Sequence, residues 1–406
     1  MSNETIQQSV ARIFSPTKLG PITLPTPVIK AATSEGRSPE GKVTQALIDF
    51  HLGFIKGGVG MTTLAYCAIS KAGFAAPGEI LMVRENIDGL KKFTQAMHDA
   101  GGLASAQLGH AGPVATKQIT GFQPVAPSNF RNPTSFQKCR EITLKEMEEI
   151  KEQFADAAEV AADSGFDAIE LHFGHLYLVS SFMSPWINKR KDQYGGSIEN
   201  RTRFAKEILL KVKERVKDRL AIIIKLSMDD GIKGSIWLDE STQTAKILDE
   251  TGAVDAFELT MGSSVSKQMY LFRGDTDIDG MAATQKGIFK LGVKWFGKKI
   301  IGEYPYKDLY MLEAARQFQP IVKNAQLILL GGINDFTHIS KAFQEGFDFV
   351  AMGRALLREP EIINNIIKDP YKSGLCIHCN KCMFSVYSTT NCVFTKEYAT
   401  SSQQAV

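Results

Sequence analysis

The stretch that decides the fold occupies residues 169–201 and reads IELHFGHLYLVSSFMSPWINKRKDQYGGSIENR. It begins within a short apolar run, 168–171, which predicts a buried strand. Two histidines, His172 and His175, follow that strand, and Tyr177 comes two residues later. Two imidazoles and a phenol at the end of one strand are hydrogen-bond donors suited to binding an oxygen atom.

The same alternation of strand and helix patterns continues in both directions along the chain. Strands are predicted at 27–33, 60–66, 103–108, 168–171, 221–227, 254–260, 326–330 and 347–352. Strands that alternate with helices predict parallel pairing, and eight such units close a (β/α)8 TIM barrel. A doubly wound open sheet is the alternative, but it usually carries a glycine-rich fingerprint after its first strand, and the segment 30–36, KAATSEG, is not one.

Polar residues and glycines recur where a barrel of this kind places its chemistry, at the C-terminal ends of the strands. These ends carry Thr33, Gln107, His172, His175, Lys225, Gly331, Gly332, Gly353 and Arg354. The glycines after strands seven and eight allow backbone amides to approach a phosphate, and Arg354 adds a forked cation. Tight strand-to-helix turns are the alternative reading of each glycine site alone.

Composition excludes several classes of function. The 406 residues include 44% hydrophobic and 22% charged residues, which is typical of a globular protein with a sizeable core. A net charge of +3 is too small to indicate nucleic-acid binding. The chain contains no apolar run of transmembrane length, and its first residues lack a signal-peptide pattern, so we expect a cytoplasmic protein that is not integral to a membrane.

At this point the sequence resembles the Old Yellow Enzymes, which are FMN-containing ene-reductases also described as NADH:flavin oxidoreductases. The resemblance covers about residues 14–360. It depends on the runs AQLGHAG (106–112), GFDAIELHFGHLYL (165–178), NKRKDQYGGSIENRTRF (188–204), GGI (331–333) and MGRALLREP (352–360).

The resemblance implies bound FMN, NAD(P)H as hydride donor and a small unsaturated carbonyl compound as substrate. The residues implied for FMN are Ala31, Ala32, Thr33, Ala65, Gln107, Lys225, Gly331, Gly332, Gly353 and Arg354. His172 and His175 match the pair that binds the substrate carbonyl oxygen, and Tyr177 matches the proton donor. Lys225 stands in place of the arginine common near flavin N1, where a cation stabilises the negative charge of the reduced ring.

Five further positions depart from the family pattern. An asparagine and an arginine are expected where Thr26 and Pro27 stand, and an arginine where Pro113 stands. Phe173 replaces a small residue between the histidines, and Leu176 replaces the usual glycine after the second one. We expect these last two changes to narrow or tilt the substrate slot.

A long interval, 261–304, separates strand six from the next helix, and loops of this length are usually functional. Its segment 287–301, GIFKLGVKWFGKKII, mixes Ile288, Phe289, Trp295, Phe296 and Ile300 with lysines. We expect a lid whose apolar face covers the flavin. A basic amphipathic helix lying on a membrane surface is the alternative.

The C-terminal segment contains Cys376, Cys379, Cys382 and Cys392 in a C-x2-C-x2-C-x9-C pattern. It resembles the four-cysteine segment of 2,4-dienoyl-CoA reductases, although the spacing is tighter. The pattern predicts a metal site, either an iron–sulfur cluster or zinc, with the cluster favoured by the resemblance. We therefore divide the chain into an FMN barrel, 1–370, and a cysteine-containing extension, 371–406, that packs on it.

Other functions remain open from the sequence. A phosphate-binding barrel that is a lyase or isomerase fits the glycine turns, and a metal-dependent electron-transfer or interaction module fits the cysteines. A tRNA dihydrouridine synthase is also an FMN barrel, but it would be expected to carry a strongly basic added domain. The sequence does not decide between NADH and NADPH, and a homo-oligomer is compatible with it.

Overall fold

A closed parallel barrel forms the centre of the computed structural model, which describes residues 3–283, 287–383 and 389–395. The order β3-β14-β13-β12-β11-β10-β6-β4, closed by pairing of β3 with β4, makes eight neighbouring parallel strands. Each predicted strand coincides with one of them. The (β/α)8 prediction is therefore confirmed.

The strands of the barrel are β3 (Val28–Lys30), β4 (Met61–Ala68), β6 (Leu103–Gly109), β10 (Ala168–Phe173), β11 (Ala221–Ser227), β12 (Ala256–Thr260), β13 (Gln326–Leu330) and β14 (Phe349–Met352). Smaller strands are β1 (Thr17–Leu19), β2 (Ile22–Leu24), β5 (Ile80–Leu81), β7 (Val125–Ala126), β8 (Phe130–Arg131) and β9 (Lys138–Glu141).

The helices up to β12 are α1 (Asn3–Ile13), α2 (Gln45–Lys56), α3 (Ile87–Asp99), α4 (Lys117–Thr120), α5 (Leu144–Asp163), α6 (Leu178–Met183), α7 (Ile198–Val216) and α8 (Leu238–Asp249). After β12 follow α9 (Met269–Phe272), α10 (Ile278–Ala283), α11 (Ile288–Ile301), α12 (Leu312–Ala315), α13 (Phe336–Gln344), α14 (Arg354–Arg358) and α15 (Ile362–Lys368).

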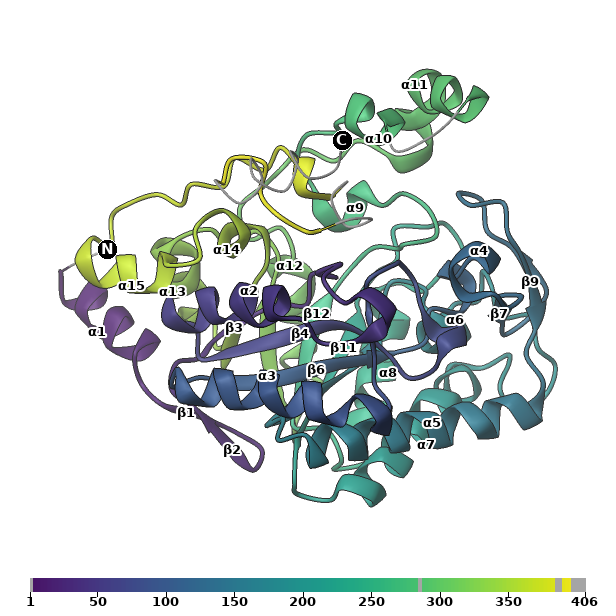
Figure 1. Cartoon of the computed structure of the whole chain (residues 1–406), viewed down its shortest axis with the longest axis horizontal. Helices are drawn as coiled ribbons and strands as arrows, with labels where there is room; N and C mark the ends of the chain where they lie inside the picture. Colours follow the sequence, from purple (N-terminus) through teal and green to yellow (C-terminus); the bar gives the residue numbers. More distant parts are fainter. Residues whose placement is uncertain (1–2, 284–286, 384–388, 396–406) are drawn as a thin grey trace.

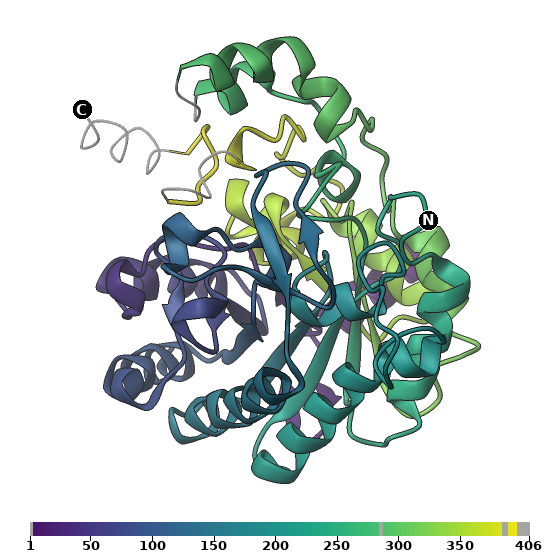
Figure 2. The same cartoon turned by 90° about the vertical axis from the view of Figure 1, so that its right-hand side faces the viewer.

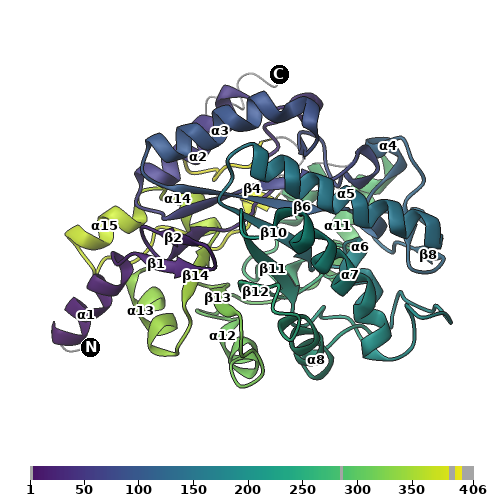
Figure 3. The same cartoon turned by 90° about the horizontal axis from the view of Figure 1, so that it is seen from below.

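The long helices surround the barrel because each buries one apolar face against the strands (Figure 1). Helix α5 begins at a capping box, in which Thr143 and Glu146 satisfy each other's backbone amides. The opposite, N-terminal end of the barrel is closed by the β1–β2 hairpin (Figure 3). Leu19 and Leu24 of this hairpin pack into a buried cluster with Ile29 and Phe349 from the strands. The C-terminal end of the barrel is therefore the end that remains open for a binding site.

Two segments lie over that C-terminal end. Helices α10 and α11, from the long interval after β12, project beyond the barrel, and residues 369–383 run across between them and the barrel (Figures 1 and 2). The segment 287–301, expected to be a lid, contains helix α11. None of the helices in the described ranges is long and apolar enough to cross a membrane.

Candidate active site

A cavity of about 500 Å³ opens at the C-terminal end of the barrel. This volume lies within the range of small-molecule and cofactor pockets. Its lining includes the predicted residues Ala31, Ala32, Thr33, Gln107, His172, His175, Tyr177, Lys225, Gly331, Gly332, Gly353 and Arg354. The predicted residue Ala65 does not line it. That residue is buried behind Tyr66, which occupies the cavity wall instead.

The two histidines and the tyrosine that follow β10 lie together on one side of the cavity. The ring centroids of His172 and His175 are 5.1 Å apart, and those of His172 and Tyr177 are 4.3 Å apart. Nε2 of His175 lies 2.9 Å from Oγ1 of Thr260, the last residue of β12. In the described part of the chain, the buried Nδ1 of His172 has no hydrogen-bond partner. A protein neighbour therefore fixes the ring of His175 but not that nitrogen of His172.

Burial keeps both imidazoles neutral. It lowers the pKa of His175 to about 3, with a further contribution from the charge of Lys225. Burial, the neighbouring His175 and Lys225 together lower the pKa of His172 well below its ordinary value. A neutral imidazole offers one N–H donor, so each ring can donate to an oxygen in the cavity without carrying a charge.

Backbone geometry explains how both rings reach the same side. His175 and Leu176 have φ angles of 60° and 59°, in the left-handed region. The amide of His175 donates to Oγ of Ser227 on β11 at 2.9 Å, which holds this turn to the next strand. Leu176 occupies a conformation that favours glycine, in agreement with the family pattern. Phe173 and Leu176 are both fully buried and do not line the cavity, so their side chains do not narrow the slot directly, and a tilt of the slot stays a prediction.

A buried polar group supports Thr33. Nζ of Lys30 donates to Oγ1 of Thr33 at 2.8 Å and to Oε1 of Glu35 at 2.6 Å. The second oxygen of Glu35 accepts the amide hydrogen of Ala65 at 2.8 Å. Glu35 therefore fixes both Thr33 and the backbone behind Tyr66, and the sequence pattern did not point to it.

A second buried group surrounds Lys225. Nζ of Lys225 makes an ion pair with Glu258 and lies 3.4 Å from Oε1 of Glu170. Nε2 of Gln107 donates to the same Glu170 oxygen at 2.5 Å. A lysine buried inside a barrel needs an anionic partner, and here the partners are carboxylates from the two adjacent strands.

The two glycine turns have different surroundings. A Cβ on Gly331 would lie 2.6 Å from Cγ of Met311, and one on Gly332 would lie 2.5 Å from the amide nitrogen of Leu309. Both residues also have positive φ. Glycine is therefore required at 331 and 332 for two reasons: the backbone conformation of the turn and the close packing of the segment before α12. A Cβ on Gly353 would meet only Cγ2 of Thr33 at 3.8 Å, so the cavity is open there.

Arg354 begins α14 and lines the same cavity. Its Nη1 donates to the carbonyl oxygen of Arg273 at 2.9 Å and also to Oδ1 of Asn380 in the C-terminal segment. The guanidinium thus connects the cavity to the segment that crosses it.

Several cavity residues were missed by the sequence analysis. Tyr66 and Thr260 lie at the ends of predicted strands, so the rule that found Lys225 and His172 would also have found them. Asn334, His378 and Thr390 come from later segments, and no pattern in the sequence indicates that they reach the cavity. The hydroxyl of Thr390 donates to the carbonyl oxygen of Ser34 at 2.6 Å, which brings the C-terminal segment to the end of β3.

Of the described side chains in helices α10 and α11, Met281 and Ile301 line the cavity. The outer face of α11 is exposed to solvent: Trp295 is 79% exposed and Phe296 is 57% exposed. The side chains of Ile288, Phe289 and Ile300 lie outside the described part of the structure. Among the described side chains, Met281 and Ile301 cover the cavity, whereas Trp295 and Phe296 do not line it.

The four C-terminal cysteines gather at one place. Cys376, Cys379, Cys382 and Cys392 line a small cavity of about 20 Å³ together with Arg354 and Arg358. Among the described residues, however, no three histidine, cysteine, aspartate or glutamate side chains converge closely enough to hold a single metal ion.

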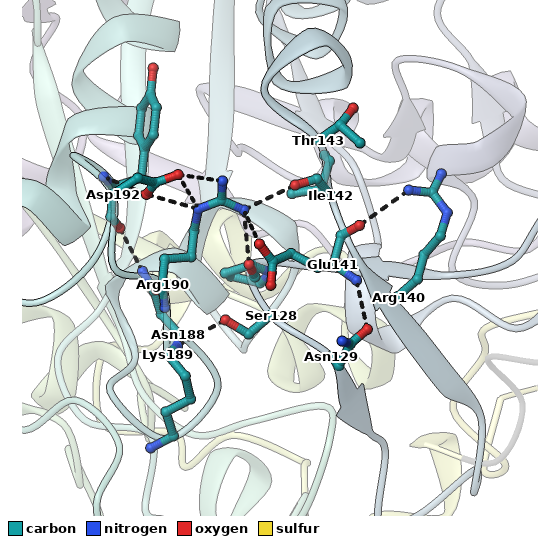
Figure 4. Close-up of polar contacts among 12 residues, drawn as sticks. Ser128, Asn129, Arg140, Glu141, Ile142, Thr143, Asn188, Lys189, Arg190 and Asp192 are labelled. Carbon is teal, nitrogen blue, oxygen red and sulfur yellow. Dashed lines mark hydrogen bonds and ion pairs between the residues drawn. The ribbon is translucent and has the colours of Figure 1, made fainter.

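The motif at 188–196 is structural. Arg190 is buried and donates to the carbonyl oxygens of Pro127 and Ile142 at 3.0 and 2.9 Å, while Asp192 accepts from its other nitrogens (Figure 4). Arg190 therefore holds the β7–β9 region against the chain after α6. This region carries Asn132 and Thr134, which line the cavity.

Comparison with known proteins identifies relatives. Residues 12–267 match the NADH:flavin oxidoreductase / NADH oxidase family. The chain is 43% identical to the 4,4'-dithiodibutanoate disulfide reductase of Rhodococcus erythropolis, over 94% of each chain. It is 32% identical to the NADH oxidase of Thermoanaerobacter brockii, over 91% of this chain and 52% of that one.

A solved 2-naphthoyl-CoA reductase has the same fold, with a TM-score of 0.83 at 22% identity, over 96% of this chain and 58% of that one. The chain therefore spans nearly all of the Rhodococcus enzyme but only about half the length of the other two.

Proposed function

The chain belongs to the NADH:flavin oxidoreductase / NADH oxidase family and is an FMN-dependent oxidoreductase; on this premise we propose that it reduces the C=C bond of an α,β-unsaturated carbonyl compound with electrons from NAD(P)H. The observation that carries the proposal is the pair of buried, neutral imidazoles, His172 and His175, beside Tyr177 at one cavity wall. FMN supplies hydride transfer when bound.

The residues that line the cavity fit this cofactor. The phosphate would be bound by the backbone around Gly331, Gly332 and Gly353, with Arg354 as the cation. Gln107 and Lys225 would contact the polar edge of the ring, and Ala31, Ala32 and Thr33 would lie against it. Ala65 would act from behind the wall, through its hydrogen bond to Glu35.

Each proposed catalytic residue acts on the substrate in a separate way. Arrival of a hydride at the β-carbon leaves negative charge on the carbonyl oxygen, which His172 and His175 stabilise by donating N–H hydrogen bonds. Tyr177 gives its phenolic proton to the α-carbon as a general acid. Thr260 is a positioning residue, because it contacts the ring of His175 and not the reacting atoms.

Phenolic ligands test the oxygen site. In His172→Ala with His175→Ala, the charge-transfer band that a bound phenol gives with FMN should be lost, while the FMN content stays unchanged. Retained phenol binding would contradict the proposed role of the two rings. As a matched control, His110→Ala removes a buried histidine whose Nδ1 accepts the amide hydrogen of Gly112 and which does not line the cavity, so the band should remain.

The two half-reactions test Tyr177. Tyr177→Phe should slow reoxidation of the reduced enzyme by an unsaturated ketone, on the order of 100-fold, because only that half needs the proton. Reduction by NAD(P)H should change little. Equal slowing of both halves, measured by stopped-flow absorbance of FMN, would assign Tyr177 a structural role.

A second candidate function is reduction of an organic disulfide, favoured by the 43% identity to the 4,4'-dithiodibutanoate disulfide reductase. Two electrons from the reduced flavin would cleave the S–S bond, and two protons would complete two thiols. Reoxidation of the same reduced enzyme by 4,4'-dithiodibutanoate and by 2-cyclohexenone distinguishes the functions, since the acceptor with the larger second-order rate constant is preferred.

For the C-terminal segment we propose an iron–sulfur cluster held by Cys376, Cys379, Cys382 and Cys392. Tetrahedral zinc with Zn–S bonds of about 2.3 Å needs sulfur atoms roughly 3.8 Å apart, whereas these cysteines line a shared cavity without converging on one ion. The cluster would join the extension, 371–406, to the barrel of 1–370. Analysis of anaerobically purified protein for iron, sulfide and zinc tests this, and zinc alone would contradict it.

A further inference from the structure

A layer of buried charges lies inside the barrel at the base of the cavity. Lys225 and Glu258 are neighbours in the register of β11 and β12, and their side chains form an ion pair. Glu170 from β10 is the second carboxylate beside Lys225. Lys30, paired with Glu35, lies across the barrel on β3. The side chains of all five are at most 5% exposed.

The carboxylates in this layer outnumber the cations. Two lysines face three glutamates, so complete ionisation would leave one uncompensated negative charge in a buried place. This excess of negative charge raises the pKa of Glu258. Burial and the charge of Glu170 raise the pKa of Glu258 to about 8, although Lys225 opposes the shift. Neighbouring β13 contributes Ile328 at this level, which has no charge. Glu258 thus carries a proton at pH 7, where its contact with Lys225 is a hydrogen bond, and it becomes the anion of an ion pair with Lys225 above pH 8.

Lys225 connects this acid to the cavity. Lys225 lines the cavity wall, while Glu258 does not. In the proposed function the ammonium of Lys225 lies next to the flavin edge that becomes negative on reduction. The ammonium of Lys225 would then lie beside the reduced flavin as well as beside Glu258 and Glu170.

We propose that Glu258 is a proton-accepting site coupled through Lys225 to the redox state of the flavin, so that above neutral pH the carboxylate of Glu258 binds one proton from solvent when the flavin accepts a hydride. This inference rests on the proposed placement of FMN above Lys225. Glu258 does not touch the reacting atoms and is a positioning residue for Lys225.

In this scheme, each hydride transfer is accompanied by uptake of one solvent proton. When bound, FMN would accept one hydride, which carries two electrons and one proton, from NAD(P)H with release of NAD(P)⁺. This transfer would place one additional negative charge beside Lys225. Lys225 passes an N–H proton to the carboxylate of Glu258 and regains one from water in the cavity. The net change is uptake of one solvent proton, and the total charge of the flavin and the buried layer is unchanged.

The pH window follows from the direction of these effects. Below about pH 7, Glu258 is already protonated in the oxidised enzyme, so reduction by NAD(P)H takes up no solvent proton. Above pH 8, Glu258 is ionised before reduction, and the new negative charge beside Lys225 raises the pKa of this carboxyl further. Uptake therefore appears only on the alkaline side.

Proton uptake by the wild-type holoenzyme tests the proposal directly. The enzyme is reduced anaerobically with one equivalent of NAD(P)H in weak buffer that contains a pH-indicator dye. Close to one proton per flavin should be taken up at about pH 9, one unit above that pKa, and none at about pH 6.5. Full bleaching of the flavin without uptake at pH 9 overturns the proposal. Failure of the flavin to bleach instead contradicts the proposed function.

The midpoint potential gives a second measurement with a matched control. One proton per two electrons shifts the potential by about 30 mV per pH unit, and two protons shift it by about twice that. The wild type should show the steeper slope between about pH 8 and 9.5, and Glu258→Gln should show the shallower one.

Glu79→Gln is the control, because Glu79 is a buried cavity carboxyl whose pKa burial also raises to about 8. In Glu79→Gln, the change of midpoint potential per pH unit should match that of the wild type. Loss of the steep slope in Glu79→Gln, or its survival in Glu258→Gln, assigns the proton elsewhere and overturns the proposal. If Glu258→Gln does not fold, the wild-type uptake still decides.

Discussion

A single hydroxyl sets the orientation of His175. This ring has Thr260 as its hydrogen-bond partner at 2.9 Å, and the backbone of His175 is held by Ser227 and by the amide of Ser264. If Nε2 accepts from Thr260, then Nδ1 carries the proton that the ring can donate. The tautomer of a proposed catalytic residue thus depends on a residue two strands away.

We expect Thr260→Val to weaken phenol binding and to slow the oxidative half-reaction by about tenfold, the worth of one hydrogen bond of roughly 1.4 kcal/mol. Reduction of FMN by NAD(P)H should be unaffected. Titration with a phenol and stopped-flow reoxidation measure both effects. Thr244→Val is the matched control, because Thr244 is a buried threonine whose hydroxyl lies 3.3 Å from that of Thr202, outside the cavity lining. Equal losses in both variants would point to general destabilisation.

At the scale of the elements, α11 has two different faces. Ile301 is 3% exposed and reaches the cavity, whereas Trp295 is 79% exposed on the outside. The lysines beside Trp295 include Lys294 and Lys298, which pair with Asp279 and Glu303. The C-terminal end of α11 therefore covers the cavity through Ile301, whereas Trp295 lies on the outer surface of the helix.

Paired variants test this separation. Ile301→Ala removes apolar contact area from the cavity wall and should raise the KM for an unsaturated substrate by about tenfold, on the order of 1.4 kcal/mol for lost methylene groups. Trp295→Ala should leave KM and kcat within about twofold, since an exposed side chain contributes little to the cavity. A change in KM for Trp295→Ala alone would contradict this. Co-sedimentation of both variants with anionic liposomes examines the membrane alternative.

Over the whole molecule, buried acids control stability on the alkaline side. Burial raises the pKa of Glu79 to about 8 and of Asp230 to about 7, as it does for Glu258. The folded state then holds protons that the unfolded state has released. Because their folded pKa values exceed the unfolded ones, the stabilising effect of protonation is lost as pH rises through 7 to 8.

We expect the melting temperature, measured with excess FMN, to fall between pH 6.5 and 8.5. Each proton retained only by the folded state contributes at most about 1.4 kcal/mol per pH unit. The buried histidines do not offset this fall, because their lowered pKa values affect stability only as pH drops below about 6.5. Glu79→Gln should make the fall in melting temperature with pH less steep. A melting temperature that rises over this range would contradict the expected protonation of these acids.

The barrel and its proposed catalytic groups could be predicted from the sequence because they depend on local sequence patterns. Each strand is a short apolar run, and parallel strands in a closed barrel bring all their C-terminal ends to one face. His172, Lys225 and Gly353 were placed at the cavity by this rule alone, without any information on distances. The capping box of Thr143 and Glu146 was equally local.

Tertiary structure decided what depends on contacts between distant segments. Glu258 and Glu170 become partners of Lys225 only because the register of three strands brings them together. His378 and Thr390 reach the cavity only because the C-terminal segment crosses it. Leu309 and Met311 pack so closely against Gly332 and Gly331 that a side chain would not fit there, and a turn motif in the sequence does not reveal this requirement. A sequence pattern encodes periodicity and turns, whereas partners across the barrel are set by the closure of the whole sheet.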